Sequence, residues 1–310
     1  MTTFEHNALT EQSVFIPLGF VDISATLDGG QAFRWHLENS GYRGVIGRRV
    51  VNISEVSGGV EVTVMDGRGV SGIYHSASQY LGLGQDLGGF AKRFADDPCL
   101  GPALIGYPGI RVLRQDPWEC LFSFITSSTS NIARIKLNVG SAAEKLGYSI
   151  GPNTTDVVFP EPEVIVESGE QYLRDLGFGF RAKYLVLCAE AIASGQLDLF
   201  DLRECSYTDA RTTLTQLHGV GEKIADCVLA FSLDKPESFI VDRHIFRALR
   251  KWYGLSEKCS LSYASEWARD HFGEYSALAN QYMFHRERLS ARAIAWGGAH
   301  VDRALPEDGV

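Results

Sequence analysis

A turn flanked by two glycines is the feature that most constrains the fold of this chain. The segment 217–227 places Gly219 and Gly221 on either side of a valine, and an apolar run with helical spacing follows. Glycine adopts tight-turn conformations freely, and backbone N–H groups at the start of a helix can bind a phosphate oxygen. The pattern, from about residue 213 to residue 232, predicts a hairpin between two helices that binds a nucleic-acid backbone.

A lysine stands in the first turn of the second of these helices. Lys223 precedes the apolar run 224–231, so its amine is expected close to low-dielectric surroundings, where a lysine can act as a nucleophile. Making a lysine amine neutral near pH 7 requires about 4 kcal/mol, of which a helix N-terminus supplies at most about 2. Burial or a nearby cation must supply the rest. The alternative is a solvated lysine at an exposed helix start.

An aspartate nineteen residues after Lys223 has two possible roles. Asp242 directly precedes residues with helical spacing, and Gly254 is placed to end that helix. This arrangement is typical of a helix N-cap. A carboxylate at the start of a helix can accept backbone hydrogen bonds and still face a reacting group, so capping and catalysis are compatible.

Composition limits how this chain can bind its partners. The 310 residues carry a formal net charge of −9, which argues against binding nucleic acid through a general basic field, so any DNA contact must be local. Six cysteines are scattered without Cys-x-x-Cys spacing, and we expect reduced thiols, no metal and no cofactor. No apolar run is long enough to span a membrane, so we expect a soluble intracellular protein with no membrane contact.

Two halves with different periodicity predict an α+β fold. We expect an N-terminal β-rich domain at 1–107, with an antiparallel sheet over about 15–77, because short alternating segments there are separated by glycine-containing turns. From 108 to 310 the period is that of helices throughout. No internal repeat interrupts either half.

The first helix of the second half has a well-marked start. Asp116 is the expected N-cap, Pro117 the first helical residue, and Glu119 is placed for a capping box. Further helices are expected over about 131–146, 171–176, 182–194, 207–217, 223–232, 243–253, 263–272 and 275–289.

Several motifs, taken together and in order, resemble the 8-oxoguanine DNA glycosylase family of the helix-hairpin-helix Gly/Pro/Asp superfamily. Besides the hairpin, the lysine and the aspartate, they are Gly30–Trp35, Gln115–Ile125, Asn131–Ile135 and Leu176–Tyr184. The similarity runs from about Phe15 to Phe284. It implies a helix-hairpin-helix catalytic region and a bifunctional DNA glycosylase/AP lyase of base excision repair. Such an enzyme excises 8-oxoguanine, opposite cytosine, from double-stranded DNA, and we expect a monomer.

The resemblance also implies roles for individual residues in the catalytic site. Lys223 would attack C1′ of a nucleotide rotated out of the duplex and form a Schiff base, with Asp242 stabilising charge at the sugar. Lys223 and Cys227 are four residues apart, as are Asn280 and Phe284, so each pair shares a helix face. The base-pocket residues implied by the resemblance are Cys227 and Phe284 on the two faces of the base, Gly30 as carbonyl acceptor, and Asn280 at the pairing edge.

A second group of residues would contact DNA. Arg134 and Arg181 resemble the arginines that bind the cytosine left behind, and Phe180 resembles an aromatic wedge. The other expected DNA contacts are Gly219 and Gly221 in the hairpin, His244 at a phosphate, and Thr129, Ser130 and Asn131. His244 is equally compatible with a partly buried helix residue.

The chain departs from the family pattern at three places. Thr129-Ser130-Asn131 replaces three consecutive asparagines, Asn280 replaces a glutamine, and His218 replaces a proline. These changes concern fine specificity rather than the reaction type.

Two other functions remain open from the residues. In a non-catalytic helix-hairpin-helix DNA-binding protein, Lys223 would contact phosphate and Asp242 would only cap its helix. A relative that excises other damaged purines would use water instead of a lysine. A Schiff-base aldolase is disfavoured because the chain lacks the strand–helix alternation of an α/β barrel.

Overall fold

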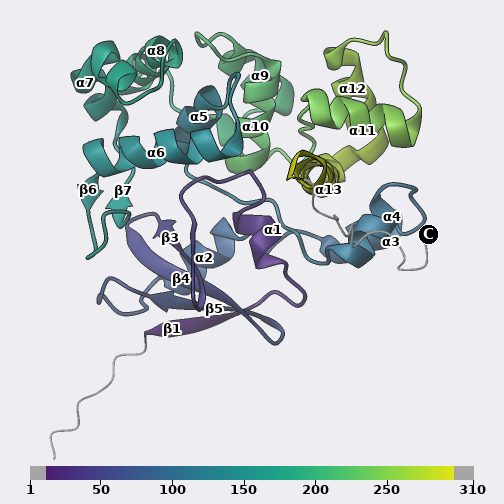
Figure 1. The fold of residues 1–310 in the computed structure, drawn as a ribbon, viewed down its shortest axis with the longest axis horizontal. Helices are drawn as coiled ribbons and strands as arrows, with labels where there is room; N and C mark the ends of the chain where they lie inside the picture. Colours follow the sequence, from purple (N-terminus) through teal and green to yellow (C-terminus); the bar gives the residue numbers. More distant parts are fainter. Residues whose placement is uncertain (1–11, 297–310) are drawn as a thin grey trace, which may run out of the picture.

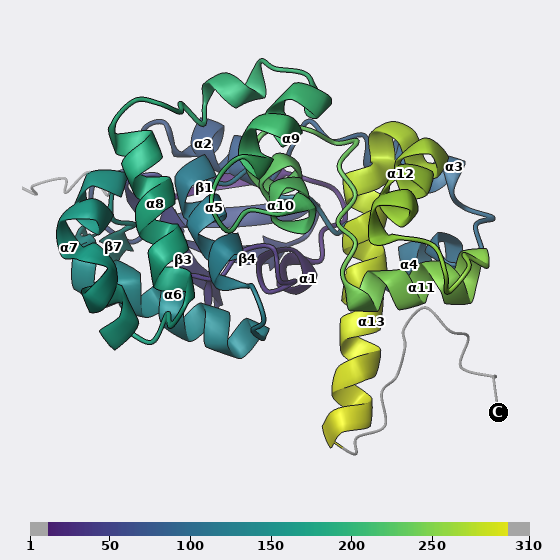
Figure 2. The same cartoon turned by 90° about the horizontal axis from the view of Figure 1, so that it is seen from above.

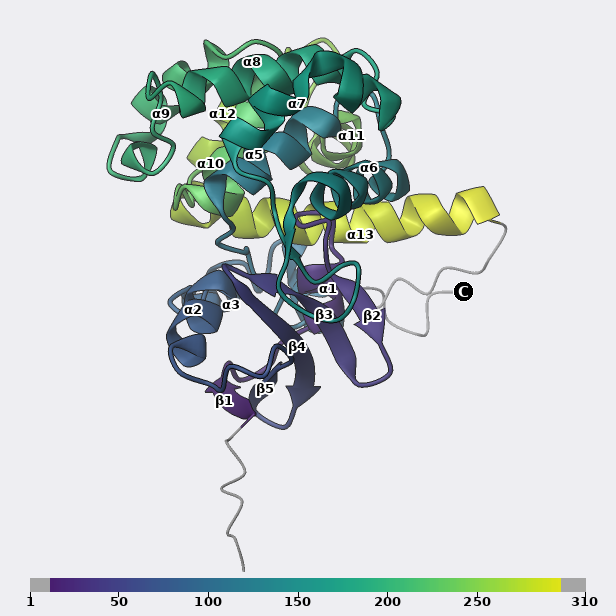
Figure 3. The same cartoon turned by 90° about the vertical axis from the view of Figure 1, so that its left-hand side faces the viewer.

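The chain folds into a sheet layer and a helical layer that lie against each other (Figures 1 and 3). The computed structural model describes residues 12–296, with side chains up to Leu289. The sheet is antiparallel and has the strand order β1-β5-β4-β3-β2. Its strands are β1 (Ser13–Pro17), β2 (His36–Glu38), β3 (Gly41–Ile46), β4 (Arg49–Val56) and β5 (Gly59–Val64). The predicted α+β class is therefore confirmed.

The alternation of apolar and polar residues along the strands explains why one face of the sheet is buried. In β5, Val60, Val62 and Val64 are buried while Glu61 is exposed, as expected where one side of a strand packs on a core. The β4–β5 register places Ile53 opposite Val62, so branched side chains meet across the two strands.

Two helices interrupt the region that the sequence predicted as continuous sheet, and that part of the prediction is wrong. They are α1 (Ile23–Leu27), capped by the Asp22 carboxylate, and α2 (Ile73–Tyr80). Both are short, so the apolar spacing of a single helical face does not repeat often enough to be recognised. They cover the sheet's apolar face, where Ile73 and Ala77 join the sheet core.

The helical layer follows from α5 onward. Its helices are α5 (Pro117–Thr126), α6 (Ile132–Leu146), α7 (Pro162–Asp175), α8 (Arg181–Ala193), α9 (Tyr207–Thr215), α10 (Glu222–Ser232), α11 (Arg243–Tyr253), α12 (Leu261–Phe272) and α13 (Ser276–Trp296). A small hairpin of β6 (Tyr148–Ser149) and β7 (Val157–Val158) contradicts the expectation of helical structure throughout, because strands of two residues have no readable period.

The start of α5 confirms its predicted cap but not its capping box. The Asp116 carboxylate accepts from the N–H of Glu119 at 3.0 Å, and Pro117 is the first helical residue. The Glu119 carboxylate instead accepts two hydrogen bonds from Arg34, at 2.7 and 2.8 Å. The carboxylate thus ties the helix to the segment after α1.

Two helices from the first third of the chain pack with the helical layer. They are α3 (Leu87–Arg93) and α4 (Leu100–Gly106), and Phe90, Phe94 and Tyr107 are buried in the same core as α10 and α12. The long α13 contacts α4 and α11 and runs along the boundary between the layers (Figures 2 and 3). The domain boundary expected at 107/108 stays a prediction, and the ranges 1–11 and 297–310 lie outside the described residues.

Buried ion pairs also connect the two layers. Arg43 of β3 donates to Asp156, just before β7, at 2.8 and 2.6 Å. Burial opposes ionisation of this carboxyl group, but the Arg43 guanidinium holds the pKa of Asp156 below its usual value. Removing either partner would leave a buried charge uncompensated, at a cost of about 3–5 kcal/mol.

Candidate active site

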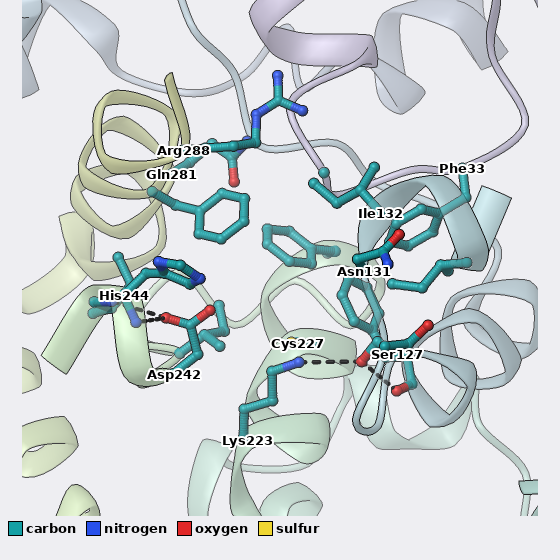
Figure 4. Close-up of a pocket in the computed structure, with 18 of the residues that line it drawn as sticks. Phe33, Ser127, Asn131, Ile132, Lys223, Cys227, Asp242, His244, Gln281 and Arg288 are labelled. Atoms are coloured by element: carbon teal, nitrogen blue, oxygen red, sulfur yellow. Dashed lines mark hydrogen bonds between the residues drawn. The ribbon is translucent and has the colours of Figure 1, made fainter. Parts of the chain in front are cut away.

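A cavity of about 590 Å³ opens where helices of the helical layer meet the segment after α1 (Figure 4). Nine of the residues expected at the site line it: Gly30, Ser130, Asn131, Lys223, Cys227, Asp242, His244, Asn280 and Phe284. Thr129, Arg134, Phe180, Arg181, Gly219 and Gly221 do not. The expected catalytic and base-pocket residues are thus brought together, while most of the expected DNA contacts lie outside the cavity.

Lys223 reaches the cavity from the first turn of α10, which directly follows the hairpin. Its side-chain nitrogen donates to Ser127 Oγ at 3.1 Å and lies 5.8 Å from the centre of the Phe124 ring. No carboxylate of the described residues lies within ion-pair distance of this amine. The lysine is therefore held by a neutral acceptor, the Ser127 hydroxyl (Figure 4), and by the aromatic face of Phe124.

The hairpin that positions α10 requires its first glycine. Gly219 has φ +83°, and a Cβ there would lie 2.4 Å from the Tyr184 ring. Gly221 is the N-cap of α10 and has no side chain to occupy the end of the helix. Both glycines are exposed, so the turn can approach another molecule closely.

Asp242 is both a helix cap and a cavity residue. Its Oδ1 accepts from the N–H groups of His244 and Ile245, each at 2.8 Å, at the start of α11. Gly254 ends the helix in the left-handed conformation, as the sequence predicted. Because both hydrogen bonds use the same oxygen, Oδ2 stays available in the carboxylate that borders the cavity (Figure 4).

A thiol and an aromatic ring border the cavity beside these groups. Cys227, one turn after Lys223, is buried, and burial raises the pKa of its thiol to about 12, so it is neutral. Phe284 of α13 packs close to Gly30, where an added Cβ would lie 2.9 Å from the ring. Gly30 also has φ +90°, so only glycine fits this position without strain.

Two amide side chains from α13 complete this wall. Asn280 is buried, and its Nδ2 donates to the carbonyl of Ile240 at 2.8 Å, which leaves Oδ1 as an acceptor. Gln281 is also buried, lines the same cavity, and donates from Nε2 to the carbonyl of Gly29 at 3.4 Å. Gln281 was not predicted from the sequence, because its place beside Asn280 carries no separate signal.

The expected DNA-binding arginines form a cluster next to the cavity. Arg181 donates to the carbonyls of Ser128 and Thr129, at 2.7 and 3.0 Å, and Arg134 Nε donates to Asn138 at 3.0 Å. Burial and the nearby Arg134 lower the pKa of Arg181. Neither arginine pairs with a carboxylate among residues 12–289, so both charges are available to hydrogen-bond acceptors of a partner.

Phe180 stands beside this cluster at the N-cap of α8. Its side chain is 49% exposed, and the Arg181 guanidinium lies 4.6 Å from its ring centre. An exposed aromatic ring braced by a cation is suited to insertion between bases. Thr129, whose carbonyl accepts from Arg181, lies in the turn between α5 and α6 and has the strained φ of +52°.

Comparison with known proteins places both halves of the chain in related families. Residues 13–121 match the N-terminal domain of 8-oxoguanine DNA glycosylase, and residues 122–269 match the HhH-GPD superfamily of base excision DNA repair proteins. Over 256 residues the chain is 31% identical to the N-glycosylase/DNA lyase OGG1 of Arabidopsis thaliana, covering 77% of this chain and 66% of that protein.

Solved structures agree over nearly the whole chain. The chain is 32% identical to MBOgg1, solved in complex with a low affinity DNA ligand, with a TM-score of 0.85 over 91% of this chain and 97% of that one. It is 31% identical to the Clostridium acetobutylicum 8-oxoguanine glycosylase/lyase, solved with dsDNA containing cytosine opposite to 8-oxoG, with a TM-score of 0.80 over 87% and 93%.

The chain belongs to the 8-oxoguanine DNA glycosylase family. The expectation of an N-glycosylase/DNA lyase is thereby confirmed at the level of the family, and the chain spans just under two thirds of the length of the Arabidopsis relative. Residues of both matched regions line the cavity: Gly30 comes from the first region, and Lys223 and Asp242 come from the second.

Three further residues of this glycosylase fold escaped the sequence analysis. Ser127 accepts the hydrogen bond from Lys223, and Asp28 and Lys136 form an ion pair while both line the cavity. The partners are 96 and 108 residues apart, so no local pattern links them. Only the polar interruption after α5 marks Ser127 in the sequence.

No helix within the described residues is long and apolar enough to cross a membrane. Over the same part of the chain, no group of three or more histidine, cysteine or acidic side chains is arranged to hold a metal ion.

Proposed function

We propose that this chain is a bifunctional DNA glycosylase and AP lyase, acting as a monomer, that excises 8-oxoguanine opposite cytosine from duplex DNA. One observation carries the proposal: the Lys223 amine, held by a neutral hydroxyl, lines the same cavity as the Asp242 carboxylate. A carboxylate partner would hold the lysine in an ion pair, whereas the Ser127 hydroxyl leaves the nitrogen able to turn toward a nucleotide in the cavity.

In the first step the damaged nucleotide rotates out of the duplex into the cavity. The Lys223 nitrogen attacks C1′, the bond from C1′ to the base breaks, and its electron pair leaves with the base, which takes up a proton. Positive charge builds on the sugar as the bond breaks. Asp242 stabilises that charge with its carboxylate, and its helix cap keeps the carboxylate in place.

The second step explains why the chain uses an amine instead of water. The lysine–sugar adduct opens to a Schiff base, which withdraws electrons and acidifies the hydrogen on C2′. Loss of that proton and of the 3′ phosphate by β-elimination then cuts the strand. Hydrolysis of the Schiff base releases Lys223 for another cycle.

Base recognition follows from one hydrogen. Oxidation at C8 places a hydrogen on N7, where guanine has a lone pair, so the Gly30 carbonyl can accept only from the lesion. Guanine would leave this acceptor unpaired, at about 1–3 kcal/mol. Asn280 Oδ1 is suited to the N–H groups of the pairing edge, and the protonated Cys227 thiol and Phe284 ring would flank the base.

Recognition of the opposite base rests on the arginine cluster. Arg134 and Arg181 offer donors next to the cavity and have no carboxylate partner within the described residues. Cytosine presents two acceptors, O2 and N3, once its partner has left the helix. The Clostridium acetobutylicum relative solved with cytosine opposite the lesion supports this assignment.

The direct test is borohydride trapping on duplexes that carry 8-oxoguanine opposite each of the four bases, with an abasic-site duplex alongside. The wild type should form a covalent adduct and cut fastest opposite cytosine. Lys223→Gln should abolish the adduct, whereas the control Lys183→Gln, which removes an exposed charge from α8, should not.

Each competing function gives a different result. Binding without any adduct would identify a non-catalytic DNA-binding protein and overturn the proposal. Excision of another damaged purine in preference to 8-oxoguanine would overturn the substrate while leaving the lysine chemistry in place. Equal trapping by the Lys223 variant would remove the proposed nucleophile.

A further inference from the structure

The segment Asp28–Gln31, which carries the Gly30 carbonyl, is fixed on its inner side by one buried amide. Gln31 is fully buried, and its Nε2 donates to the carbonyls of Thr26 and Arg111 at 2.9 and 2.8 Å. Its Oε1 accepts from the N–H of Leu113 at 2.8 Å. Both N–H groups and the oxygen of this amide are thus bonded to the backbone of α1 and of residues 111–113, which holds the chain directly after Gly30 in place.

The outer side of the same segment is held by the helical layer. The Asp28 carboxylate pairs with the Lys136 ammonium on α6, and the Gly29 carbonyl accepts from Gln281 on α13 at 3.4 Å. At Gly29 an added Cβ would lie 1.9 Å from the Ala25 carbonyl oxygen and 2.7 Å from Gln281 Nε2. The segment therefore has contacts on both sides and no room to shift.

We infer that Lys136, acting through Asp28, is a positioning residue that sets how well the Gly30 carbonyl engages the lesion during excision. The Asp28–Lys136 pair is called the latch below. An acceptor that could turn away would escape the penalty of facing the N7 lone pair of guanine, and it would also bind the N7–H of the lesion less well. A fixed carbonyl enforces both effects.

This inference rests on the proposed function, because the latch matters only if the Gly30 carbonyl reads the base. The geometry favours it over a simpler role for Lys136. Both side chains are about one-third exposed, at 30% for Lys136 and 35% for Asp28, and both line the cavity at the segment they hold. The ammonium is thus occupied by Asp28 before any phosphate arrives.

The competing interpretation is that Lys136 contacts a DNA phosphate directly. The two interpretations differ at Asp28. If the latch positions Gly30, Asp28→Asn should have the same defect as Lys136→Met, because each breaks the same pair. If Lys136 binds phosphate, Asp28→Asn should leave binding unchanged or strengthen it, because it frees the ammonium.

The experiment compares two single-turnover rates for each variant: excision of 8-oxoguanine opposite cytosine, and cleavage at a preformed abasic site. The abasic substrate has no base, so its cleavage does not depend on the Gly30 carbonyl. Lys136→Met and Asp28→Asn should each lower the ratio of excision to cleavage by roughly threefold to tenfold, as for directly coupled residues. The exchanged pair Asp28→Lys with Lys136→Asp should recover part of the loss.

A charge-matched control is present on the same helix. Lys145→Met removes an exposed lysine from the last turn of α6 and should leave the ratio unchanged. Equal loss of both rates in Lys136→Met, with no defect in Asp28→Asn, would overturn the latch in favour of a phosphate contact. Normal excision by the wild type with unchanged ratios in both variants would overturn the latch alone. A wild type that fails to excise 8-oxoguanine would overturn the proposed function and the latch with it.

Discussion

The amine nitrogen of Lys223 lies 3.1 Å from the hydroxyl oxygen of Ser127, and that hydroxyl donates in turn to the carbonyl of Phe124 at 2.6 Å. The hydroxyl hydrogen is therefore directed away from the lysine, and the oxygen presents a lone pair to it. Ser127 comes from the end of α5 and Lys223 from the start of α10, so the contact between these two helices positions the proposed nucleophile.

A charge at position 127 should therefore inhibit the reaction. Ser127→Asp would hold the Lys223 side chain in an ion pair and keep its nitrogen from attacking C1′, so borohydride trapping should fall at least about tenfold. Ser127→Asn, with the same shape and no charge, is the control, and an equal loss in both variants would contradict the electrostatic explanation.

The two roles of Asp242 should separate by substitution. Asp242→Asn keeps a capping oxygen but loses the charge, so stability should change little while excision of 8-oxoguanine falls by roughly a hundredfold or more. Asp242→Ala should lose the activity and also about 1 kcal/mol of stability. Urea unfolding and single-turnover excision measure the two effects. Wild-type excision by the Asn variant would show that Asp242 is only a cap.

The arginine cluster should determine the preference for the opposite base. Arg181→Ala should slow excision opposite cytosine about tenfold more than excision opposite adenine, because it removes the guanidinium proposed to bind the O2 and N3 acceptors of cytosine. Lys183→Ala, an exposed lysine on the same helix, controls for the loss of one positive charge. A uniform loss opposite all four bases would indicate a general DNA contact instead.

A buried carboxyl group in the hairpin helices should make stability depend on pH. Burial raises the pKa of Asp226 from 3.8 to about 6, although the Tyr207 hydroxyl and Arg211 favour the ionised form. The folded protein then binds more protons than the unfolded chain between these values, so this group's contribution to stability falls as pH rises from about 4 to about 6. Two pKa units correspond to about 3 kcal/mol.

Asp226→Asn does not titrate, so it isolates this effect. The variant's stability relative to wild type should rise by up to about 3 kcal/mol between pH 4 and pH 7, measured by urea unfolding at each pH. A difference between Asp226→Asn and wild type that stays constant with pH would contradict the prediction.

Local signals in the sequence predicted the elements that carry the chemistry. Asp116 before a proline, and Asp242 before a periodic segment that ends in Gly254, mark helix starts because capping depends on residues within one turn. The first-turn place of Lys223 follows from the glycines in the same way. For these residues, the few positions on either side are sufficient to determine where the helix starts.

Contacts between distant segments could not be predicted in this way. Glu119 satisfies a capping-box pattern, but its carboxylate binds Arg34, 85 residues earlier in the chain. In the sequence Lys136 is only one of the positive charges near Arg134, yet it pairs with Asp28 at the end of α1. The partner of a charged side chain is determined by which residues the fold brings near it. The local spacing of residues in the sequence therefore does not indicate that partner.

Helices α3 and α4 follow the sheet in the chain, yet Phe90, Phe94 and Tyr107 pack with α12 and α13. Cutting the chain after residue 107 would therefore remove side chains that fill the interior of the helical layer. A helical fragment that keeps its core intact must begin before Leu87, at the start of α3.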